Sequence, residues 1–345
     1  MRFIEPVRQD EATGLVAQTY DAVKMHMGGP AVVRNGPFLA HSPDPELLAA
    51  FWNLAYETVL VDGRIPRADK HAIAAIVSKI NECQFCVEVH SYLSGLEGEG
   101  SDTELLMNGL AERITDAGRR RLAEWAAATR DPSSQTARKP PFTAEEAPEA
   151  IGTAVAFHYT DRVVSFFHGS DGIDPGDTPV EVVASLTQAA VEREREPGGS
   201  LLPVTDARLP EDLSWAISSP HIAAAFAGFV ATVEAAGEAV LDESERACVA
   251  AAIEAWDGSE PPLGSQWIDE ALTGLEPASS QARARLALMA ALAPHRADEA
   301  TVEAFRRERP HDRELVDAVA WSASRAARRI GSWLGATEAV SVADL

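Results

Sequence analysis

The sequence predicts an all-α protein built from two related helical domains. Its 345 residues are 46% hydrophobic but only 6% aromatic, so the apolar content is mainly alanine, valine, leucine and isoleucine. Alanine and leucine favour helix, and apolar residues recur at helical spacing along much of the chain. A chain of this length is also long enough to bury two separate cores. Two helical domains are therefore the starting prediction.

Five helices are expected in the first half of the chain. After the HSPDPE turn, apolar side chains recur every three or four positions, as on one helix face. The motif DGRIP ends this helix, and a second helix with an isoleucine-rich face follows it. A third helix begins at the NECQ segment and ends where Gly95 and Gly98 interrupt the pattern. The expected helices are residues 44–61, 67–80, 83–96, 116–130 and 145–169.

The second half of the chain repeats the first in pattern. HSPDPELLAAF resembles SSPHIAAAFAG, and aligning Pro43 with Pro220 gives an offset of 177 residues. The similarity returns near the end of each half, where TDRVVSFFHG pairs with AARRIGSWLG. We predict a tandem of two copies, residues 1–175 and 176–345. Chance similarity between two alanine-rich helical segments is the alternative explanation.

The formal net charge of −23 argues against two classes of partner. A strongly negative surface repels the phosphates of nucleic acids and anionic lipid headgroups. The first residues, MRFIEPVRQDEATG, lack the apolar core of a signal peptide, and Glu234 and Glu238 interrupt the longest alanine-rich stretch. We therefore expect a soluble cytoplasmic protein with no nucleic acid or membrane partner.

The segment NECQFCVEVH carries the candidate reactive groups. Cys83 and Cys86 lie three residues apart at a predicted helix start, and His90 follows on the same helix face. One interpretation is a redox centre, because neighbouring thiols at this spacing can close a disulfide. Amide groups at a helix start are expected to lower a cysteine pKa to neutrality or below. His90 would then exchange protons near pH 7.

A zinc site and a pair of structural thiols are the alternatives. Structural zinc normally takes four ligands, and only isolated residues such as His71 or His158 could complete the set here. Buried cysteines are also common in helical cores. In the second half the positions matching the two cysteines and His90 hold Glu260, Leu263 and Trp267. Thiol chemistry is therefore expected in the first half alone.

Two further features are expected to have no catalytic role. The third cysteine, Cys248, lies in an apolar alanine and valine run and is expected to be an inert buried thiol. The charged run EREREPGG, residues 192–199, is expected to form a solvated loop within the second copy.

The motif with its flanks resembles a known family. ADKHAIAAIVSKINECQFCVEVH, with PVRQDEATG and HSPDPELLAAFWNL upstream, resembles the alkylhydroperoxidase D-like, carboxymuconolactone decarboxylase superfamily, particularly its peroxidase-related branch. The resemblance covers most of residues 1–170, with the CxxCxxxH core as its most specific part. It implies a helical fold that assembles into homo-oligomers. It also implies a thiol-dependent peroxidase that reduces hydroperoxides, is recycled by an external dithiol and needs no metal or organic cofactor.

The resemblance also implies roles for four residues. Cys86 would be the peroxidatic thiol, Cys83 the resolving thiol, and His90 part of the proton relay. The family places a glutamate twelve residues before the first cysteine, where this sequence has His71. A histidine can carry a proton but brings no fixed negative charge, so thiolate formation would depend on pH in a different way.

The missing glutamate leaves other interpretations open. Glu82 or Glu88 could supply the carboxylate in its place. The cysteine pair could also serve a disulfide relay or a redox-responsive protein, which would react faster with protein disulfides than with peroxide. A cofactor-independent lyase of the carboxymuconolactone type, with histidines as acid and base, is the further alternative.

Overall fold

The structure is a computed structural model, and its helices confirm the all-α prediction. It describes residues 1–34, 36–98, 102–168, 194–200, 202–203 and 205–336. These residues contain no β-strand. The expected domain boundary near Pro175 lies outside the described residues, so the division into two domains stays a prediction.

The helices of the first half follow the expected order. Helix α3 starts where Asp44 accepts hydrogen bonds from the amides of Glu46 and Leu47, and it continues as a π-helical turn, Tyr56–Leu60. The α-helices are α1 (Gly14–Met27), α2 (Gly36–His41), α3 (Pro45–Ala55), α4 (Arg67–Ile80), α5 (Gln84–Glu97), α6 (Thr103–Asn108), α7 (Ala117–Ala128), α8 (Gln135–Arg138) and α9 (Ala147–His168).

The second half contains a similar succession with one difference. Its helices are η4 (Glu211–Ala216), α11 (Pro220–Val240), α12 (Glu243–Ala255), α13 (Gln266–Ala271), α14 (Ala278–Leu292), α15 (Glu299–Arg306) and α16 (Asp312–Gly335). By the offset of the repeat, α11 corresponds to α3 and α12 to α4. The cysteine-bearing α5 has a loop and the short α13 as its counterpart.

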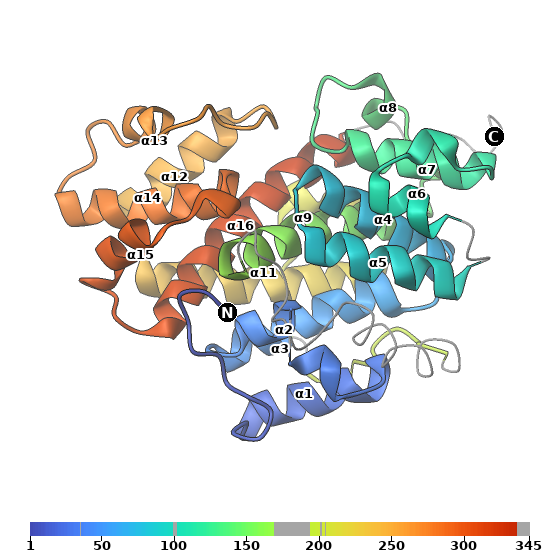
Figure 1. Cartoon of the computed structure of the whole chain (residues 1–345), viewed down its shortest axis with the longest axis horizontal. Helices are drawn as coiled ribbons and strands as arrows, with labels where there is room; N and C mark the ends of the chain where they lie inside the picture. Colours follow the sequence, from blue (N-terminus) through green and yellow to red (C-terminus); the bar gives the residue numbers. More distant parts are fainter. Residues whose placement is uncertain (35, 99–101, 169–193, 201, 204, 337–345) are drawn as a thin grey trace.

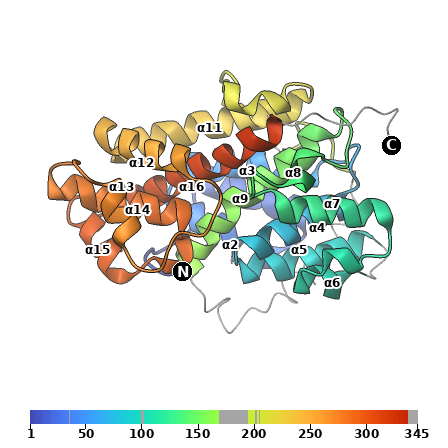
Figure 2. The ribbon, with the colours of Figure 1, turned by 90° about the horizontal axis from the view of Figure 1, so that it is seen from above.

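The two halves pack through corresponding helices. Helix α3 lies against α11, and α9 lies against α16, so that α9 runs through the middle of the molecule (Figures 1 and 2). Contacts between like elements are typical of a two-fold interface between copies. One continuous core of buried side chains includes residues from both halves. This packing joins the two halves around one buried core.

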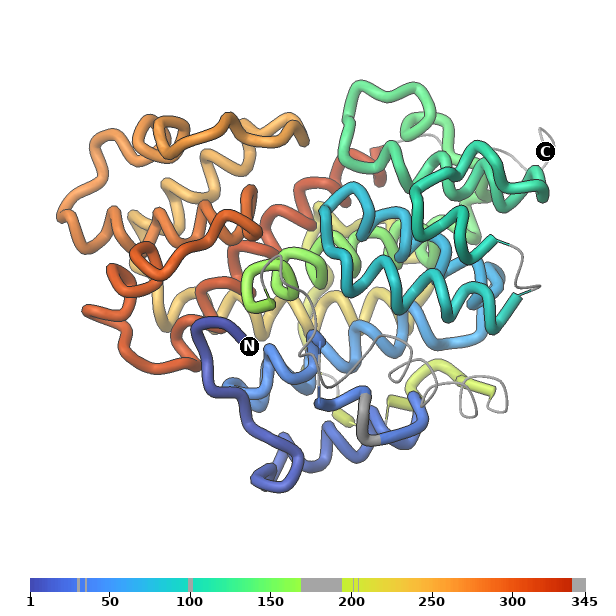
Figure 3. The backbone as a smooth tube through the Cα atoms, viewed as in Figure 1, coloured from blue at the N-terminus to red at the C-terminus, as the bar shows by residue number. Residues whose placement is uncertain are grey.

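The N-terminal segment also joins the halves. In Figure 3 the chain begins beside the helices of the second half before it turns away to α1. The Arg2 guanidinium donates to the Ala297 carbonyl at 3.1 Å, and the Glu5 amide donates to Asp312 Oδ2 at 2.8 Å. These bonds fix the start of the chain next to α15 and α16.

The charged run is only partly solvated. Arg195 is 2% exposed, and its Nη2 donates to the His26 carbonyl at 2.9 Å. Trp52 Nε1 donates to the Ser200 carbonyl at 2.8 Å. Residues 194–200 therefore lie against α1 and α3 of the first half. Glu194, Glu196, Pro197 and Gly198 are exposed, as expected for a solvated segment, whereas Arg195 is buried because it finds an acceptor on α1.

Among the described residues, α11 is the one helix that is long and apolar enough to cross a membrane by length and composition. In the structure, 56% of its most apolar window is buried, and the helix packs on α3 and α16. Glu234 accepts from Arg328 Nη1 at 2.8 Å and from Trp321 Nε1 at 2.9 Å. A helix in a protein core can be equally long and apolar, and this packing accounts for the composition of α11.

A buried ion pair attaches α9 to α4. Lys70 Nζ lies 2.9 Å from Glu149 Oε2 and donates to the Val61 carbonyl at 3.0 Å. The Glu149 carboxylate also accepts from the amides of Arg64 at 2.8 Å and Ile65 at 3.2 Å. Both charged side chains are buried and each has further hydrogen bonds, which is the condition for a buried pair to be tolerated.

Removing one member of this pair is expected to destabilise the fold. Lys70→Met leaves the Glu149 carboxylate buried without a cation, and we expect the free energy of unfolding to fall by about 3–5 kcal/mol. Urea denaturation measures the change. The exposed pair of Arg64 and Glu145, 2.8 Å apart with side chains 61% and 66% exposed, provides the control. Arg64→Ala is expected to cost less than about 1 kcal/mol, and equal effects of the two substitutions would contradict the prediction.

Candidate functional site

The two thiols of the motif lie side by side at the start of α5. Cys83 immediately precedes the helix, Cys86 lies in its first turn, and both side chains are buried. Their Sγ atoms are 2.8 Å apart, and both are free thiols. The preceding residue, Glu82, has a left-handed φ of 58°, which makes the tight turn from α4 into α5. The spacing therefore brings the thiols together as the sequence predicted.

Cys86 faces an apolar cavity of about 80 Å³, and Cys83 does not line it. The polar groups in its wall are Cys86, His71, His90 and Thr160, and the remaining wall is aliphatic and aromatic. The described residues that line it include no lysine or arginine. A cavity of this volume has room for several water molecules or a small apolar group.

His71 and His90 meet in the wall of this cavity. Their Nδ1 atoms are 3.0 Å apart, and the His71 Nε2 lies 3.8 Å from Glu97 Oε2. The Phe157 ring packs edge to face on the His90 ring, and the two ring centroids are 4.4 Å apart. One ring nitrogen must therefore donate to the other, so at least one of the two imidazoles is neutral.

The surroundings keep both histidines neutral near pH 7. Burial lowers the pKa of His90 to about 3. Burial, followed by the neighbouring His90, lowers the pKa of His71 well below its ordinary value. The expectation that His90 would titrate near pH 7 was wrong, because a low-dielectric site disfavours the imidazolium ion.

The helix start does not acidify the thiols either. Burial raises the pKa of Cys83, and it raises the pKa of Cys86 further, with Cys83 and Asp161 adding to the effect at Cys86. The prediction of lowered cysteine pKa values was therefore wrong, because loss of water outweighs the amide groups at the start of α5. Cys86 keeps its proton unless a nearby group accepts it.

Sequence analysis missed Asp161, which lies on α9 beside the two cysteines. One of its carboxyl oxygens and both Sγ atoms lie within 4.8 Å of one another. Ser78 Oγ donates to Asp161 Oδ1 at 2.8 Å, and Asn81 Nδ2 donates to Oδ2 at 2.9 Å. The available signal was an acidic residue in the otherwise apolar segment AVAFHYTDRVVSFF. An acid inside a buried helix needs partners on the facing helices.

The geometry does not supply a four-ligand zinc site. The two thiols and the Asp161 carboxylate are three donors, and no fourth histidine, cysteine or acid of the described chain joins them. His71 is occupied with His90. His158 lies between Asn81 Nδ2 at 3.0 Å and Thr129 Oγ1 at 2.9 Å, and it does not line the cavity. His158 is therefore a structural residue here.

The two glutamates considered as substitutes do not face the site. Glu82 is exposed, and Glu88 accepts from Gln84 Nε2 at 2.7 Å on the outer side of α5. Glu97 and Asp161 are the carboxylates that approach the histidines and the cysteines, respectively. Cys248, the third thiol, lies apart from this site and donates to the Ala271 carbonyl at 3.2 Å. It is half-buried, so the prediction of a buried thiol was wrong.

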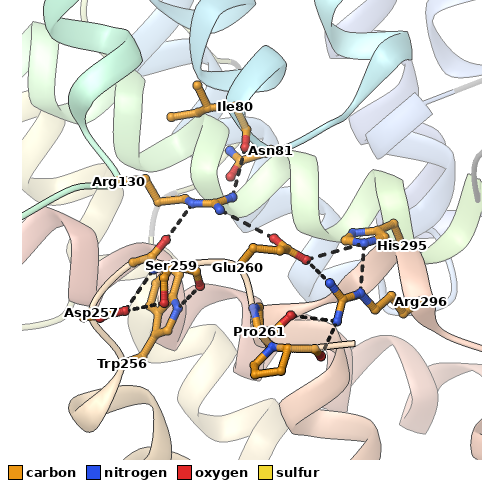
Figure 4. A network of polar contacts seen from close by, with 12 residues as sticks. Ile80, Asn81, Arg130, Trp256, Asp257, Ser259, Glu260, Pro261, His295 and Arg296 are labelled. Atoms are coloured by element: carbon orange, nitrogen blue, oxygen red, sulfur yellow. Dashed lines mark hydrogen bonds and ion pairs between the residues drawn. The ribbon is translucent and has the colours of Figure 1, made fainter. Parts of the chain in front are cut away.

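Through Arg130, a loop of the second half is joined to the end of α4 (Figure 4). Arg130 Nη1 donates to the Ile80 carbonyl at 2.9 Å, and its Nε donates to the Gly258 carbonyl at 2.8 Å. Arg130 Nη2 also lies 3.5 Å from a carboxylate oxygen of Glu260. Glu260 is the residue aligned with Cys83. The position that holds a thiol in the first half thus takes part in an ion pair in the second.

Comparison with known proteins identifies the family. Residues 45–128 match the model of the carboxymuconolactone decarboxylase family. The chain is 34% identical over 337 residues to a protein of Mycobacterium tuberculosis named alkyl hydroperoxide reductase, and the match covers 96% of this chain and 94% of that relative. The chain belongs to the alkylhydroperoxidase D-like, carboxymuconolactone decarboxylase superfamily.

The matched regions include most of the candidate site residues. The family model spans α3 to α7 and so includes both cysteines and both cavity histidines, but it ends before α9 and Asp161. The relative matches along both halves of the chain. The second half is therefore part of what this chain shares with that superfamily member.

The neutral state of His90 predicts a loss of stability in acid. The unfolded side chain binds a proton near pH 6.5, whereas the folded one binds it near pH 3. The stabilisation is thus complete above about pH 6.5 and declines as the pH falls towards 3. We expect the urea midpoint to drop less between pH 7 and pH 4.5 in His90→Gln than in the parent protein. Equal drops would contradict this assignment.

Proposed function

We propose that this superfamily member is a thiol-dependent peroxidase that reduces hydroperoxides through a dithiol–disulfide cycle of Cys83 and Cys86. The observation that carries the proposal is the pair of free thiols 2.8 Å apart, of which Cys86 lines the cavity and Cys83 does not. An attacking thiol has to meet the substrate, whereas a resolving thiol has to meet only its partner. The name of the Mycobacterium tuberculosis relative agrees with this activity.

The proposed cycle balances with two thiols and one hydroperoxide. The Cys86 thiolate attacks the terminal oxygen of ROOH, a sulfur–oxygen bond forms, the oxygen–oxygen bond breaks, and RO⁻ leaves and is protonated to ROH. Cys83 then attacks the sulfur of the Cys86 sulfenic acid, and hydroxide leaves as water. The two thiol protons depart with the alcohol and the water. An external dithiol reduces the disulfide, and a reducing compartment such as the cytoplasm would supply it.

The cavity wall favours this function over a lyase. A carboxymuconolactone substrate is anionic, and an apolar cavity binds an anion poorly unless a cation or several donors compensate it. The described lining residues offer two neutral histidines, a threonine and a thiol, without lysine or arginine. An organic hydroperoxide with an apolar group matches the same wall. A disulfide relay could use the same two thiols. Its reaction rates with peroxide and with protein disulfides distinguish it from a peroxidase.

Thiol titration with cumene hydroperoxide tests the cycle. One equivalent added to the reduced protein is expected to remove two thiols within seconds, because the sulfenic acid of Cys86 meets Cys83 at once. Cys86→Ser is expected to keep its remaining thiols on that timescale. Cys248→Ser is the matched control and is expected to lose two thiols as the parent does. Persistence of both motif thiols in the parent would refute the peroxidase proposal, and faster reaction with protein disulfides would favour the relay.

The substrate preference provides a second test. We expect the second-order rate constant for cumene hydroperoxide to exceed that for hydrogen peroxide, because the apolar wall gains from covering a hydrocarbon group at about 25 cal/mol per Å² of apolar surface. Stopped-flow measurement of thiol loss gives both constants. A higher constant for hydrogen peroxide would show that the apolar part of the cavity does not bind the substrate.

A further inference from the structure

Cys86 carries a proton that the cavity groups are poorly suited to accept. A thiol has to become a thiolate before it attacks. The cavity histidines are neutral near pH 7, and burial lowers the pKa of His90 to about 3, so its ring is a weak base at neutral pH. A base of that strength holds the thiol proton only briefly. A better acceptor has to lie elsewhere around Cys86.

Asp161 meets Cys86 from the side of α9. One of its carboxyl oxygens lies within 4.8 Å of both Sγ atoms, and the side chain is completely buried. Ser78 Oγ and Asn81 Nδ2 each donate to one of its oxygens, at 2.8 and 2.9 Å. These donors stabilise a negative charge in an interior that would otherwise neutralise it. The carboxylate is thus held in place against the reacting sulfur.

We propose that Asp161 is the proton acceptor for Cys86, and that thiol and carboxylate share a single proton between them. This inference rests on the proposed reactivity of Cys86. In the step, the sulfur–hydrogen bond breaks, an oxygen–hydrogen bond forms on Asp161, and the electron pair stays on sulfur. The transfer changes no oxidation state and needs no further reactant.

The transfer is feasible in a buried site because it leaves the net charge of the Cys86 and Asp161 pair unchanged. Release of the Cys86 proton to water would place a second negative charge beside Asp161, and both burial and Asp161 raise the thiol pKa against it. Transfer within the pair keeps the total charge at one. Burial also raises the pKa of Asp161 to about 7, which brings its proton affinity closer to that of a thiol.

The remaining groups around Asp161 do not supply a competing base. Arg162, its neighbour on α9, lowers the pKa of the carboxyl. The imidazole of His158, about one turn earlier, is neutral because burial, and then Arg162, lower its pKa. Helix α4 and its C-terminal residue contribute the neutral hydroxyl and amide described above, and the α5 segment contributes the two thiols. The pair of Cys86 and Asp161 therefore titrates as one coupled unit.

Alkylation of Cys86 by iodoacetamide tests the proposal without requiring peroxidase activity. In a background with Cys83→Ser and Cys248→Ser, the rate constant is expected to rise with an inflection near pH 7 and then to level off, because the ionised pair holds one shared proton. In Asp161→Asn the inflection is expected to disappear. The rate constant at pH 7.5 is then expected to fall by on the order of tenfold or more.

A faster alkylation of Cys86 in Asp161→Asn would overturn the proposal. A carboxylate that acted only as a fixed negative charge would oppose thiolate formation, so Asp161→Asn would then speed alkylation at pH 7.5. An unchanged rate constant would overturn the proposal as well. Asp317→Asn is the matched control, since Asp317 is a buried carboxyl on α16 whose pKa burial raises to about 9. It is already neutral near pH 7, and its replacement is expected to leave the rate constant unchanged.

A second variant keeps the test decisive if Asp161→Asn does not fold. Ser78→Ala leaves the carboxylate in place but removes a donor that lowers its pKa. The alkylation inflection is then expected to move to higher pH, which a merely structural role would not produce, and an unmoved inflection would overturn the proposal. Failure of the peroxidase proposal looks different: Cys86 would show this pH profile in alkylation while cumene hydroperoxide left the thiols of the parent protein intact.

Discussion

Helix α9 has to bury the ionisable side chains of Glu149, His158, Asp161 and Arg162 as well as Tyr159, and the elements around it supply their partners. Glu149 pairs with Lys70, His158 lies between Asn81 and Thr129, Asp161 accepts from Ser78 and Asn81, and Arg162 Nε donates to the Ala291 carbonyl at 2.7 Å. A buried polar group without a partner costs about 1–3 kcal/mol, and more if it is charged. These partners come from or next to α4, α7 and α14. The requirement to satisfy them therefore fixes three further helices around α9.

The same requirement explains how the second half contributes to a site that lies in the first. Arg162 reaches into α14, and Arg130 connects the end of α4 to the loop that carries Glu260. That loop replaces the cysteine-bearing helix of the first half. The second half thus lacks the thiols but supplies carbonyl and carboxylate acceptors to cations behind them.

Burial has opposite consequences on the two sides of Cys86. On the cavity side it lowers the pKa of both histidines, which leaves a neutral apolar wall suited to an organic group. On the α9 side it raises the pKa of Asp161 to about 7 and that of the thiol as well. A carboxylate that is a poor base in water becomes a usable one in this environment. One physical effect thus keeps the cavity wall uncharged and raises the proton affinity of the carboxyl beside Cys86.

The sequence by itself determined the helical class, the order of the first-half helices and the proximity of Cys83, Cys86 and the face of His90. These features depend on spacing along one helix and on apolar periodicity, which local sequence encodes. The tertiary structure decided the burial of Arg195, the meeting of His71 with His90 and the contact of Asp161 with a thiol 75 residues earlier in the chain. It also reversed the expected shift of the thiol pKa values and moved the pKa of His90 away from neutrality. Desolvation depends on atoms from several helices at once, so no spacing along a single helix reveals it.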